Sequence, residues 1–166
     1  MMYGVRSLLF VPANRPEHFC KAQKSGADGV CLDLEDAVAP ADKDAARQIA
    51  VSVLPRLLEH QTPVGVRINA VGSAGWQQDL AAVGALVNFV LVPKAHSAKE
   101  LATVVASVSG QTAIWPMVET AEGLRNCWDV AAAAQVRGVL AKGSSPCALS
   151  GATRTTPQCA AFAAAC

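Results

Sequence analysis

Short apolar runs rich in β-branched residues alternate along this chain with longer, alanine-rich, helix-like runs. The short runs predict strands at 7–11, 29–34, 64–69, 89–92, 112–118 and 136–141. The long runs predict helices at 14–24, 41–60, 76–86, 98–107 and 120–134. Pro55 is expected to break or kink the second helix near its end, because proline removes a helical hydrogen bond.

Strands that alternate with helices indicate a parallel sheet, and near-continuous apolar strands indicate a sheet that is covered on both faces. Two folds satisfy this pattern, an open doubly wound sheet and a closed barrel. Polar residues lie at or just after the C-terminal ends of several predicted strands: Asp33, Glu35, Asp36, Arg67, Asn69, Lys94 and Glu119. Barrels spread their chemistry over many strands in this way, whereas open sheets concentrate it at one switch point.

The first predicted strand is followed by no glycine-rich phosphate fingerprint, which further disfavours the doubly wound, dinucleotide-binding alternative. We therefore predict an α/β fold of the (β/α) TIM-barrel type. A complete barrel of this type has eight strands and about 250 residues. The 166 residues of this chain are expected to provide an incomplete barrel of about six strands.

The amino-acid composition limits the classes of binding partner that are expected. The formal net charge is +1, and 52% of the residues are hydrophobic, so neither nucleic acid nor a membrane surface is expected as a partner. No apolar run reaches the roughly 18 residues of a membrane helix, and the N-terminus lacks the features of a signal peptide. The six cysteines form no C-x-x-C pair, which fits a cytoplasmic protein with reduced thiols.

The acidic residues after the second predicted strand are the first candidate site. Asp33, Glu35 and Asp36 lie within four residues and repel one another unless a cation or hydrogen-bond donors compensate. Hard oxygen ligands of this kind suit Mg²⁺. The competing interpretation is a solvated loop in which Asp36 or Asp42 caps the following helix.

Three residues at other strand ends could complete such a site. Arg67 closes an apolar strand, where a guanidinium is costly to bury unless it meets an anion; that anion is a substrate carboxylate, the acidic residues, or both. Lys94 is either a cation for an anionic substrate or an ordinary surface lysine. Glu119 is either a metal ligand or a carboxylate favoured by the dipole of the helix that begins there.

Five sequence blocks resemble the citrate lyase β-subunit family of the HpcH/HpaI aldolase group, and they occur in the family's order. They are RSLLFVPANRP at 6–16, DGVCLDLEDAV at 28–38, VRIN at 66–69, VPKA at 92–95 and VETAEGL at 118–124. The resemblance covers most of the chain up to residue 141. A single block would be weak, but five blocks in order are specific.

The resemblance implies a Mg²⁺-dependent carbon–carbon lyase that cleaves a 3-hydroxyacyl-CoA thioester of the citryl-CoA or malyl-CoA type by a retro-aldol reaction. It implies that Arg67 grips the substrate carboxylate and that Glu119 ligates Mg²⁺. Glu35 and Asp36 would hold metal-bound waters. Lys94 and the opening block with Arg15 would lie where the acyl-CoA or another acyl thioester is received. Full-length relatives are expected to form homo-oligomers.

The chain departs from the family pattern after the sixth predicted strand. Family members carry there an aspartate that completes the metal site, but Pro146 stands in its place here. A site with Glu119 as its only direct carboxylate should bind the metal more weakly. We expect residues 1–141 to form a partial barrel domain and residues 142–166 to be a degenerate or weakly ordered tail.

Two further hypotheses remain, and the first of them follows from this departure. The first is a catalytically inactive, truncated remnant that at most binds acyl-CoA or a full-length partner. The second is the doubly wound binding domain already described. A six-stranded sheet would also leave two open edges, so we expect a poorly stable fragment.

Overall fold

Six parallel strands form the centre of the computed structural model, which describes residues 5–141. They are β1 (Leu8–Pro12), β2 (Gly29–Asp33), β3 (Val64–Arg67), β4 (Phe89–Val92), β5 (Ala113–Val118) and β6 (Leu140–Ala141). Each strand pairs in parallel with the next one along the chain, so the order is β1-β2-β3-β4-β5-β6. A doubly wound sheet reverses its strand order at a switch point, and this sheet does not. The barrel-type prediction is therefore confirmed.

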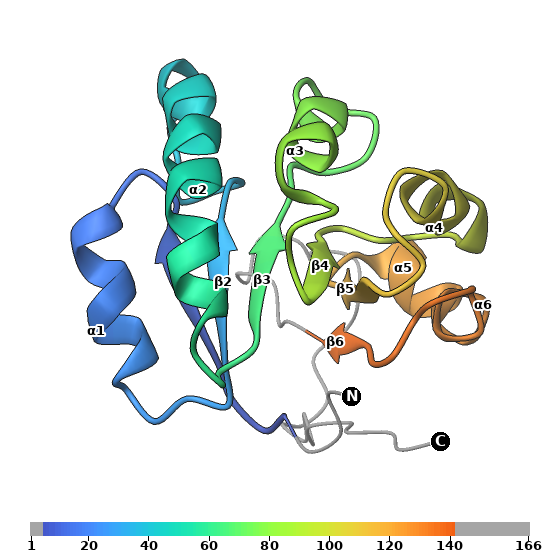
Figure 1. The fold of residues 1–166 in the computed structure, drawn as a ribbon. Helices are drawn as coiled ribbons and strands as arrows, with labels where there is room; N and C mark the ends of the chain where they lie inside the picture. The colour runs from blue at the N-terminus through green and yellow to red at the C-terminus, as the bar shows by residue number, and fades with distance from the viewer. Residues whose placement is uncertain (1–4, 142–166) are drawn as a thin grey trace, which may run out of the picture.

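Helices follow the first five strands and lie along the outer side of the curled sheet (Figure 1). They are η1 (Pro16–His18), α1 (Phe19–Gln23), η2 (Pro40–Asp42), α2 (Lys43–Leu58), α3 (Trp76–Val83), α4 (Ala98–Val105), α5 (Ala121–Arg125) and α6 (Cys127–Ala131). None of the helices within 5–141 combines the length and apolar character needed to cross a membrane.

Two details of the predicted helices were wrong. Helix α2 continues through Pro55 to Leu58; the proline lies in the last turn, so the hydrogen bond that it removes is one of the last in the helix. The helix expected at 120–134 is instead two short helices that meet at Asn126. The side chain of Asn126 leaves this junction and donates a hydrogen bond of 2.8 Å to the carbonyl oxygen of His96.

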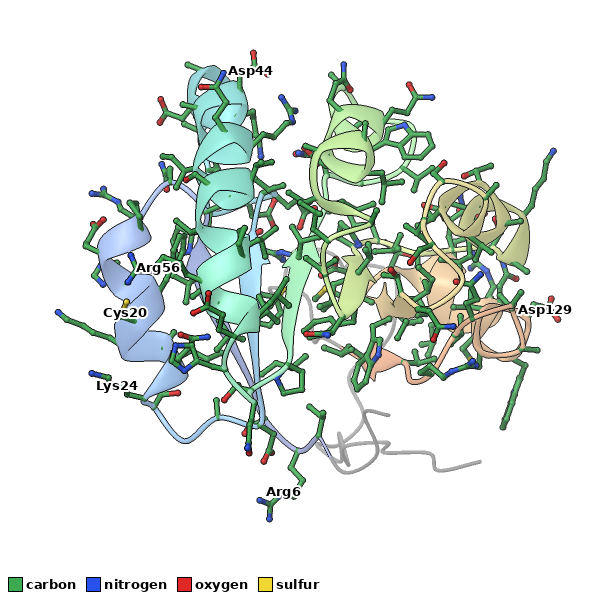
Figure 2. The ribbon with its side chains drawn as sticks, in the orientation of Figure 1. Arg6, Cys20, Lys24, Asp44, Arg56 and Asp129 are labelled. Atoms are coloured by element: carbon green, nitrogen blue, oxygen red, sulfur yellow. The ribbon has the colours of Figure 1, made fainter. Side chains whose placement is uncertain are left out.

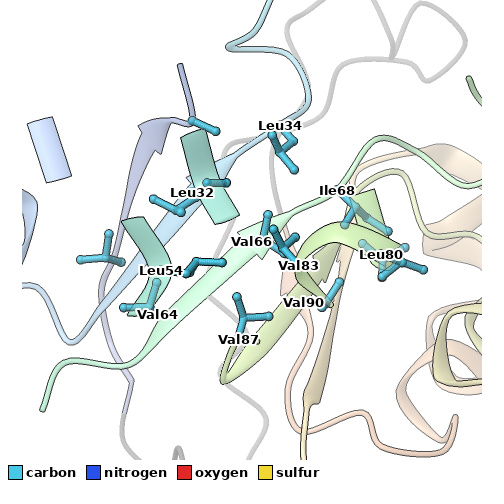
Figure 3. Packing of buried hydrophobic residues seen from close by; sticks show 14 of the residues in the cluster. Leu32, Leu34, Leu54, Val64, Val66, Ile68, Leu80, Val83, Val87 and Val90 are labelled. Carbon is cyan, nitrogen blue, oxygen red and sulfur yellow. The ribbon is translucent and has the colours of Figure 1, made fainter. Parts of the chain in front are cut away.

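Apolar side chains cover both faces of the sheet, because successive residues of a strand point to opposite faces. The face that packs against the helices carries Val30, Leu32, Val66 and Val90, and Figure 3 shows Leu32, Val66 and Val90 packed with Leu54 of α2 and Val83 of α3. The opposite, inner face carries a smaller cluster of Cys31, Phe89, Leu91 and Met117. This arrangement explains why β4, and β2 up to Leu32, carry apolar residues on both faces.

The inner cluster depends on a glycine. Gly65 of β3 is the register partner of Phe89 in β4. A Cβ atom on Gly65 would lie 2.1 Å from Cε2 of the Phe89 ring, which is fully buried. The aromatic ring therefore occupies the space that a side chain at position 65 would need.

We predict that Gly65→Ala lowers the free energy of unfolding by about 1–3 kcal/mol, because the added methyl group overpacks the inner cluster. Urea unfolding followed by circular dichroism would measure the loss. Gly110→Ala is the matched control, since a Cβ there meets nothing within 4 Å. Equal unfolding midpoints for the two variants would contradict this account of the inner face.

Candidate functional site

The register of β2 and β3 places Asp33 directly beside Arg67, each at the C-terminal end of its strand. Both side chains are almost fully buried. The Nε atom of Arg67 donates to Oδ1 of Asp33 at 2.9 Å, and Nη2 donates to Oδ2. The pair is thus bidentate, the geometry in which a guanidinium binds a carboxylate most strongly. The predicted ion pair between Arg67 and the acidic residues is confirmed.

A second carboxylate and an aromatic ring complete the surroundings of the guanidinium. Nη1 of Arg67 forms an ion pair of 3.0 Å with Oε2 of Glu35, and that oxygen accepts no hydrogen bond from the residues at 5–141. The Phe10 ring lies 5.3 Å from the guanidinium carbon, within the range of a cation–π contact. Burial by itself would lower the pKa of Arg67, but the hydrogen bonds that it donates to Asp33 and the charges of the nearby carboxylates raise it.

Lys94 connects the acidic residues of the loop after β2 to Glu119. Its Nζ atom lies 2.8 Å from Oε1 of Glu35 and 3.8 Å from Oδ1 of Asp36. Its backbone N–H donates to Oε1 of Glu119 at 3.0 Å. Glu35, Asp36, Arg67 and Glu119, the four residues expected to converge, are therefore connected through one set of contacts at the C-terminal rim of the sheet.

The backbone of the acidic loop is held by residues that sequence reasoning did not assign to the site. Lys43, at the start of α2, donates to the carbonyl oxygens of Leu34 and Glu35. Asn69, one of the polar residues at the strand ends, donates through Nδ2 to the carbonyl of Leu34 at 3.1 Å. The Glu35 N–H donates to Oδ1 of Asp33 at 2.8 Å. These bonds fix the direction in which the Glu35 side chain leaves the loop.

Asp79 of α3 binds Asn69 and Arg47 and so holds Asn69 in place beside the acidic loop. The residue is fully buried; its Oδ2 accepts hydrogen bonds of 2.7 Å from both the backbone N–H and the Nδ2 of Asn69. Its Oδ1 accepts from Nε of Arg47 at 2.7 Å. The sequence does indicate that Asp79 is buried, because it lies on the apolar side of α3, beside Leu80 and four residues before Val83.

Two predicted site positions are not joined to these contacts. Arg15 is exposed and forms an ion pair of 3.9 Å with Glu17, and no hydrogen bond or ion pair found within 5–141 connects it to Glu35 or Lys94. Pro146, predicted to replace an aspartate ligand, and the tail at 142–166 lie outside the described residues.

The protonation of Glu35 reflects its burial. Removal from water raises the pKa of its carboxyl group, and this outweighs the opposing effects of the Lys94 hydrogen bond and the Arg67 charge. Burial likewise lowers the pKa of Lys43, against the pull of the surrounding carboxylates. Glu35 therefore holds its proton more tightly than a carboxyl group in water does.

The donor chemistry of the rim suits a divalent cation, but the described residues supply only part of a metal site. The carboxylates of Glu35, Asp36 and Glu119 offer the hard oxygen atoms that Mg²⁺ prefers. Within 5–141, however, no group of three or more His, Cys, Asp or Glu side chains is arranged to hold an ion. Instead, the ammonium group of Lys94 stands between Glu35 and Asp36, where a cation would fit.

We predict that Asp79→Ala lowers the free energy of unfolding by about 3–5 kcal/mol, because the buried Arg47 and Asn69 donors lose their partner. Chemical denaturation would measure the change. Asp129→Ala is the control, since Asp129 points outward from α6 (Figure 2) and its loss should have almost no effect. A cost for Asp79→Ala no larger than that of the control would refute the anchoring role.

The raised pKa of Glu35 also makes the stability of the fold depend on pH. A carboxyl group whose folded-state pKa is raised binds its proton more tightly in the folded protein, so it stabilises the fold below its unfolded pKa. That stabilisation is lost as the pH rises through the folded pKa. We therefore expect the stability of the wild type relative to Glu35→Gln to fall as the pH rises from about 4 towards neutral. A difference that is constant or grows with pH would contradict the raised pKa.

Comparison with known proteins supplies the family. The family model described as HpcH/HpaI aldolase/citrate lyase matches residues 6–164. A citrate lyase subunit beta-like protein of Mycobacterium tuberculosis is 43% identical over 133 residues, which are 80% of this chain and 45% of that protein. A (3S)-malyl-CoA thioesterase of Cereibacter sphaeroides is 34% identical over 137 residues, 81% of this chain and 47% of that protein.

The solved structures agree with this assignment. The protein CitE from Mycobacterium tuberculosis, in complex with magnesium, acetoacetate and coenzyme A, superposes with a TM-score of 0.69 and 36% identity. The match covers 85% of this chain and 49% of that one, and the chain likewise spans about half the length of the curated relatives that it matches. By both sequence and fold, the chain belongs to the HpcH/HpaI aldolase/citrate lyase family.

Proposed function

We propose that this chain carries the substrate-binding and metal-binding rim of a Mg²⁺-dependent carbon–carbon lyase. Its substrate would be a 3-hydroxyacyl-CoA thioester of the citryl-CoA or malyl-CoA type. The observation that carries the proposal is the connected set of Arg67, Glu35, Asp36, Lys94 and Glu119 at the C-terminal ends of the strands. Barrel enzymes place their active sites at this end. The relatives support the substrate class, since one is named for malyl-CoA and another was solved with coenzyme A.

Arg67 would bind the carboxylate of the substrate. A guanidinium carries five N–H donors, and the two hydrogen bonds to Asp33 use only Nε and one donor of Nη2. Nη1 is already paired with Glu35, so an incoming carboxylate would use the second N–H of Nη2 and share Nη1 with Glu35. Because Asp33 and Phe10 already fix the plane of the guanidinium, the substrate would meet a preorganised fork, and orientation of this kind lowers the barrier of the reaction.

Glu119 would ligate Mg²⁺ directly, while Glu35 and Asp36 would hold its waters. The metal, when bound, would supply Lewis-acid stabilisation of the oxyanion that develops in the retro-aldol cleavage. In that reaction the 3-hydroxyl group gives its proton to a base as the carbon–carbon bond breaks and its carbon becomes a carbonyl, and the departing enolate takes up a proton to give acetyl-CoA. Glu35 is held for its part by the loop contacts of Lys43 and Asp33, so its carboxylate is positioned before any ligand arrives.

Lys94 and Arg15 would meet the anionic part of the acyl-CoA. The Lys94 side chain is half-exposed and that of Arg15 is more than half-exposed, so both cations are accessible to a ligand that approaches from solvent. Their positions after β4 and β1 place them at the same rim as Arg67. Cations at exposed positions of this kind steer anionic ligands more than they add to affinity.

The test is release of acetyl-CoA from (3S)-malyl-CoA or citryl-CoA in the presence of Mg²⁺. We expect Arg67→Lys to lower kcat/KM by about 100-fold, because lysine cannot reproduce the planar fork. Removal of Mg²⁺ by a chelator should abolish turnover. Arg56→Lys is the matched control: Arg56 is exposed on α2, away from the rim (Figure 2), and its replacement should leave the rate unchanged.

One observation favours a second candidate function, the binding of acyl-CoA without turnover. Within 5–141 the carboxylates do not form a complete metal site. Isothermal titration with malyl-CoA, run beside the activity assay, separates the two functions. Binding that depends on Arg67 but yields no acetyl-CoA would support the second candidate, and neither binding nor turnover would contradict both.

A further inference from the structure

We propose that His96, oriented by Glu100, is a general base that catalyses hydrolysis of the thioester bond of a bound acyl-CoA. His96 lies in the connection of residues 93–97 between β4 and α4, and Glu100 lies in the first turn of α4. The substrate class rests on the proposed function, but the reaction is a different one. It breaks a carbon–sulfur bond and uses neither Arg67 nor a metal ion.

Glu100 holds His96 at two points. Its Oε2 accepts a hydrogen bond of 3.1 Å from the backbone N–H of His96, and Nδ1 of the imidazole lies 3.0 Å from the same oxygen. Only 7% of the Glu100 side chain is exposed, whereas 43% of the His96 side chain is exposed. The pair therefore combines a fixed carboxylate with an imidazole that is open to solvent, which is how a carboxylate orients a catalytic histidine.

The neighbours of Nδ1 determine the tautomer of the imidazole. Besides Glu100, Nδ1 contacts the carbonyl oxygen of Lys94 at 3.3 Å. A carbonyl oxygen accepts hydrogen bonds but has no proton to donate, so Nδ1 carries the proton of the neutral ring. The lone pair is then on Nε2, and among the residues at 5–141 no hydrogen bond or ion pair reaches that atom. Nε2 is thus available as a base.

The backbone around His96 is anchored to β5 and α5. The N–H of Ala95 donates to the carbonyl of Met117 at 3.1 Å, and the carbonyl oxygen of His96 accepts from Nδ2 of Asn126 at 2.8 Å. Helix α5 approaches so closely that a Cβ atom on Gly123 would lie 2.4 Å from the carbonyl oxygen of Ala95. A base on such a support keeps its orientation when a ligand binds.

The imidazole lies beside the residue proposed to meet the ligand. His96 follows Lys94 by two residues, and their connection begins at the C-terminal end of β4, the end at which barrel enzymes bind substrate. Because Lys94 would meet the anionic part of the acyl-CoA, the same ligand would lie next to His96. Water also reaches Nε2, since the imidazole is half-exposed.

The proposed reaction needs only water as a co-reactant. Nε2 of His96 takes a proton from a water molecule while the water oxygen adds to the carbonyl carbon of the thioester. The carbon–sulfur bond then breaks, and the imidazolium returns the proton to the departing thiolate. The products are a carboxylic acid and the free CoA thiol, whereas the lyase reaction releases acetyl-CoA.

The activity test follows the free CoA thiol released from (3S)-malyl-CoA in the presence of a chelator, which silences the Mg²⁺-dependent lyase reaction. We expect His96→Gln to lower the rate of thiol release by about 100-fold, within the range that a general base contributes. His18→Gln is the matched control, because His18 is a similarly exposed histidine beside a carboxylate, that of Glu17. Its rate should equal that of the wild type. Equal rates for the wild type and His96→Gln would overturn the inference.

A second measurement tests the orienting role of Glu100 without relying on activity. Nitrogen NMR of isotopically labelled histidine reports which ring atom carries the proton. In the wild type, the neutral His96 ring should carry it on Nδ1. Glu100→Gln, which removes the charge but keeps an oxygen acceptor, should increase the share of rings protonated on Nε2 and slow thiol release. A wild-type ring that carries its proton on Nε2 would contradict the proposal, because that atom could not then act as a base.

The two products distinguish this inference from the function on which its substrate rests. If the wild type releases acetyl-CoA with Mg²⁺ but no thiol under any condition, the hydrolytic role of His96 is wrong while the lyase proposal stands. If thiol release depends on His96 but no acetyl-CoA appears, the hydrolytic role is supported and the lyase proposal fails. If neither product forms, both proposals fail.

Discussion

The pair of Arg67 and Asp33 is the interaction on which the rim depends. It forms because β2 and β3 are parallel neighbours in a register that sets these two residues side by side. Removing two charges from water is costly, and only good geometry with further hydrogen bonds offsets that cost. Here Asp33 also receives the Glu35 N–H, and the guanidinium also meets Glu35. A buried charge pair thus determines where the acidic loop begins and which way it turns.

The architecture was readable from the sequence because it rests on local patterns. Apolar runs predicted all six strands, and their alternation with helices predicted the parallel order. The errors lie where tertiary contacts override local preference. Asn126 interrupts the expected helix at 120–134 by bonding to His96, a residue 30 positions away. Pro55 was expected to break or kink α2 near its end, but the helix continues through it to Leu58, and Leu54 and Leu57 on either side of it are buried in the core.

The candidate site was predictable in part because it, too, shows in local sequence patterns. The polarity of Arg67 and the acidic residues at strand ends stands out against apolar strands, and parallel strands bring such positions to one rim. Lys43 and Asp79 were missed because their roles are contacts with the backbone or with distant side chains: Lys43 donates to the carbonyl of Leu34, and Asp79 accepts from Arg47, 32 residues away. Only the folded chain reveals which of the many lysines and aspartates make such contacts. The grouping of Glu119 with Lys94 likewise depends on the left-handed backbone at position 94.

The sequential order of the strands has a consequence for how the molecule forms. Each strand pairs with the one synthesised just before it, so every pairing in the sheet can be made as soon as the next βα segment leaves the ribosome, without waiting for distant parts of the chain. The rim is different, since the contact between Lys94 and Glu35 joins residues 59 positions apart. The scaffold can therefore grow step by step, while the chemistry is assembled only once several of those steps are complete.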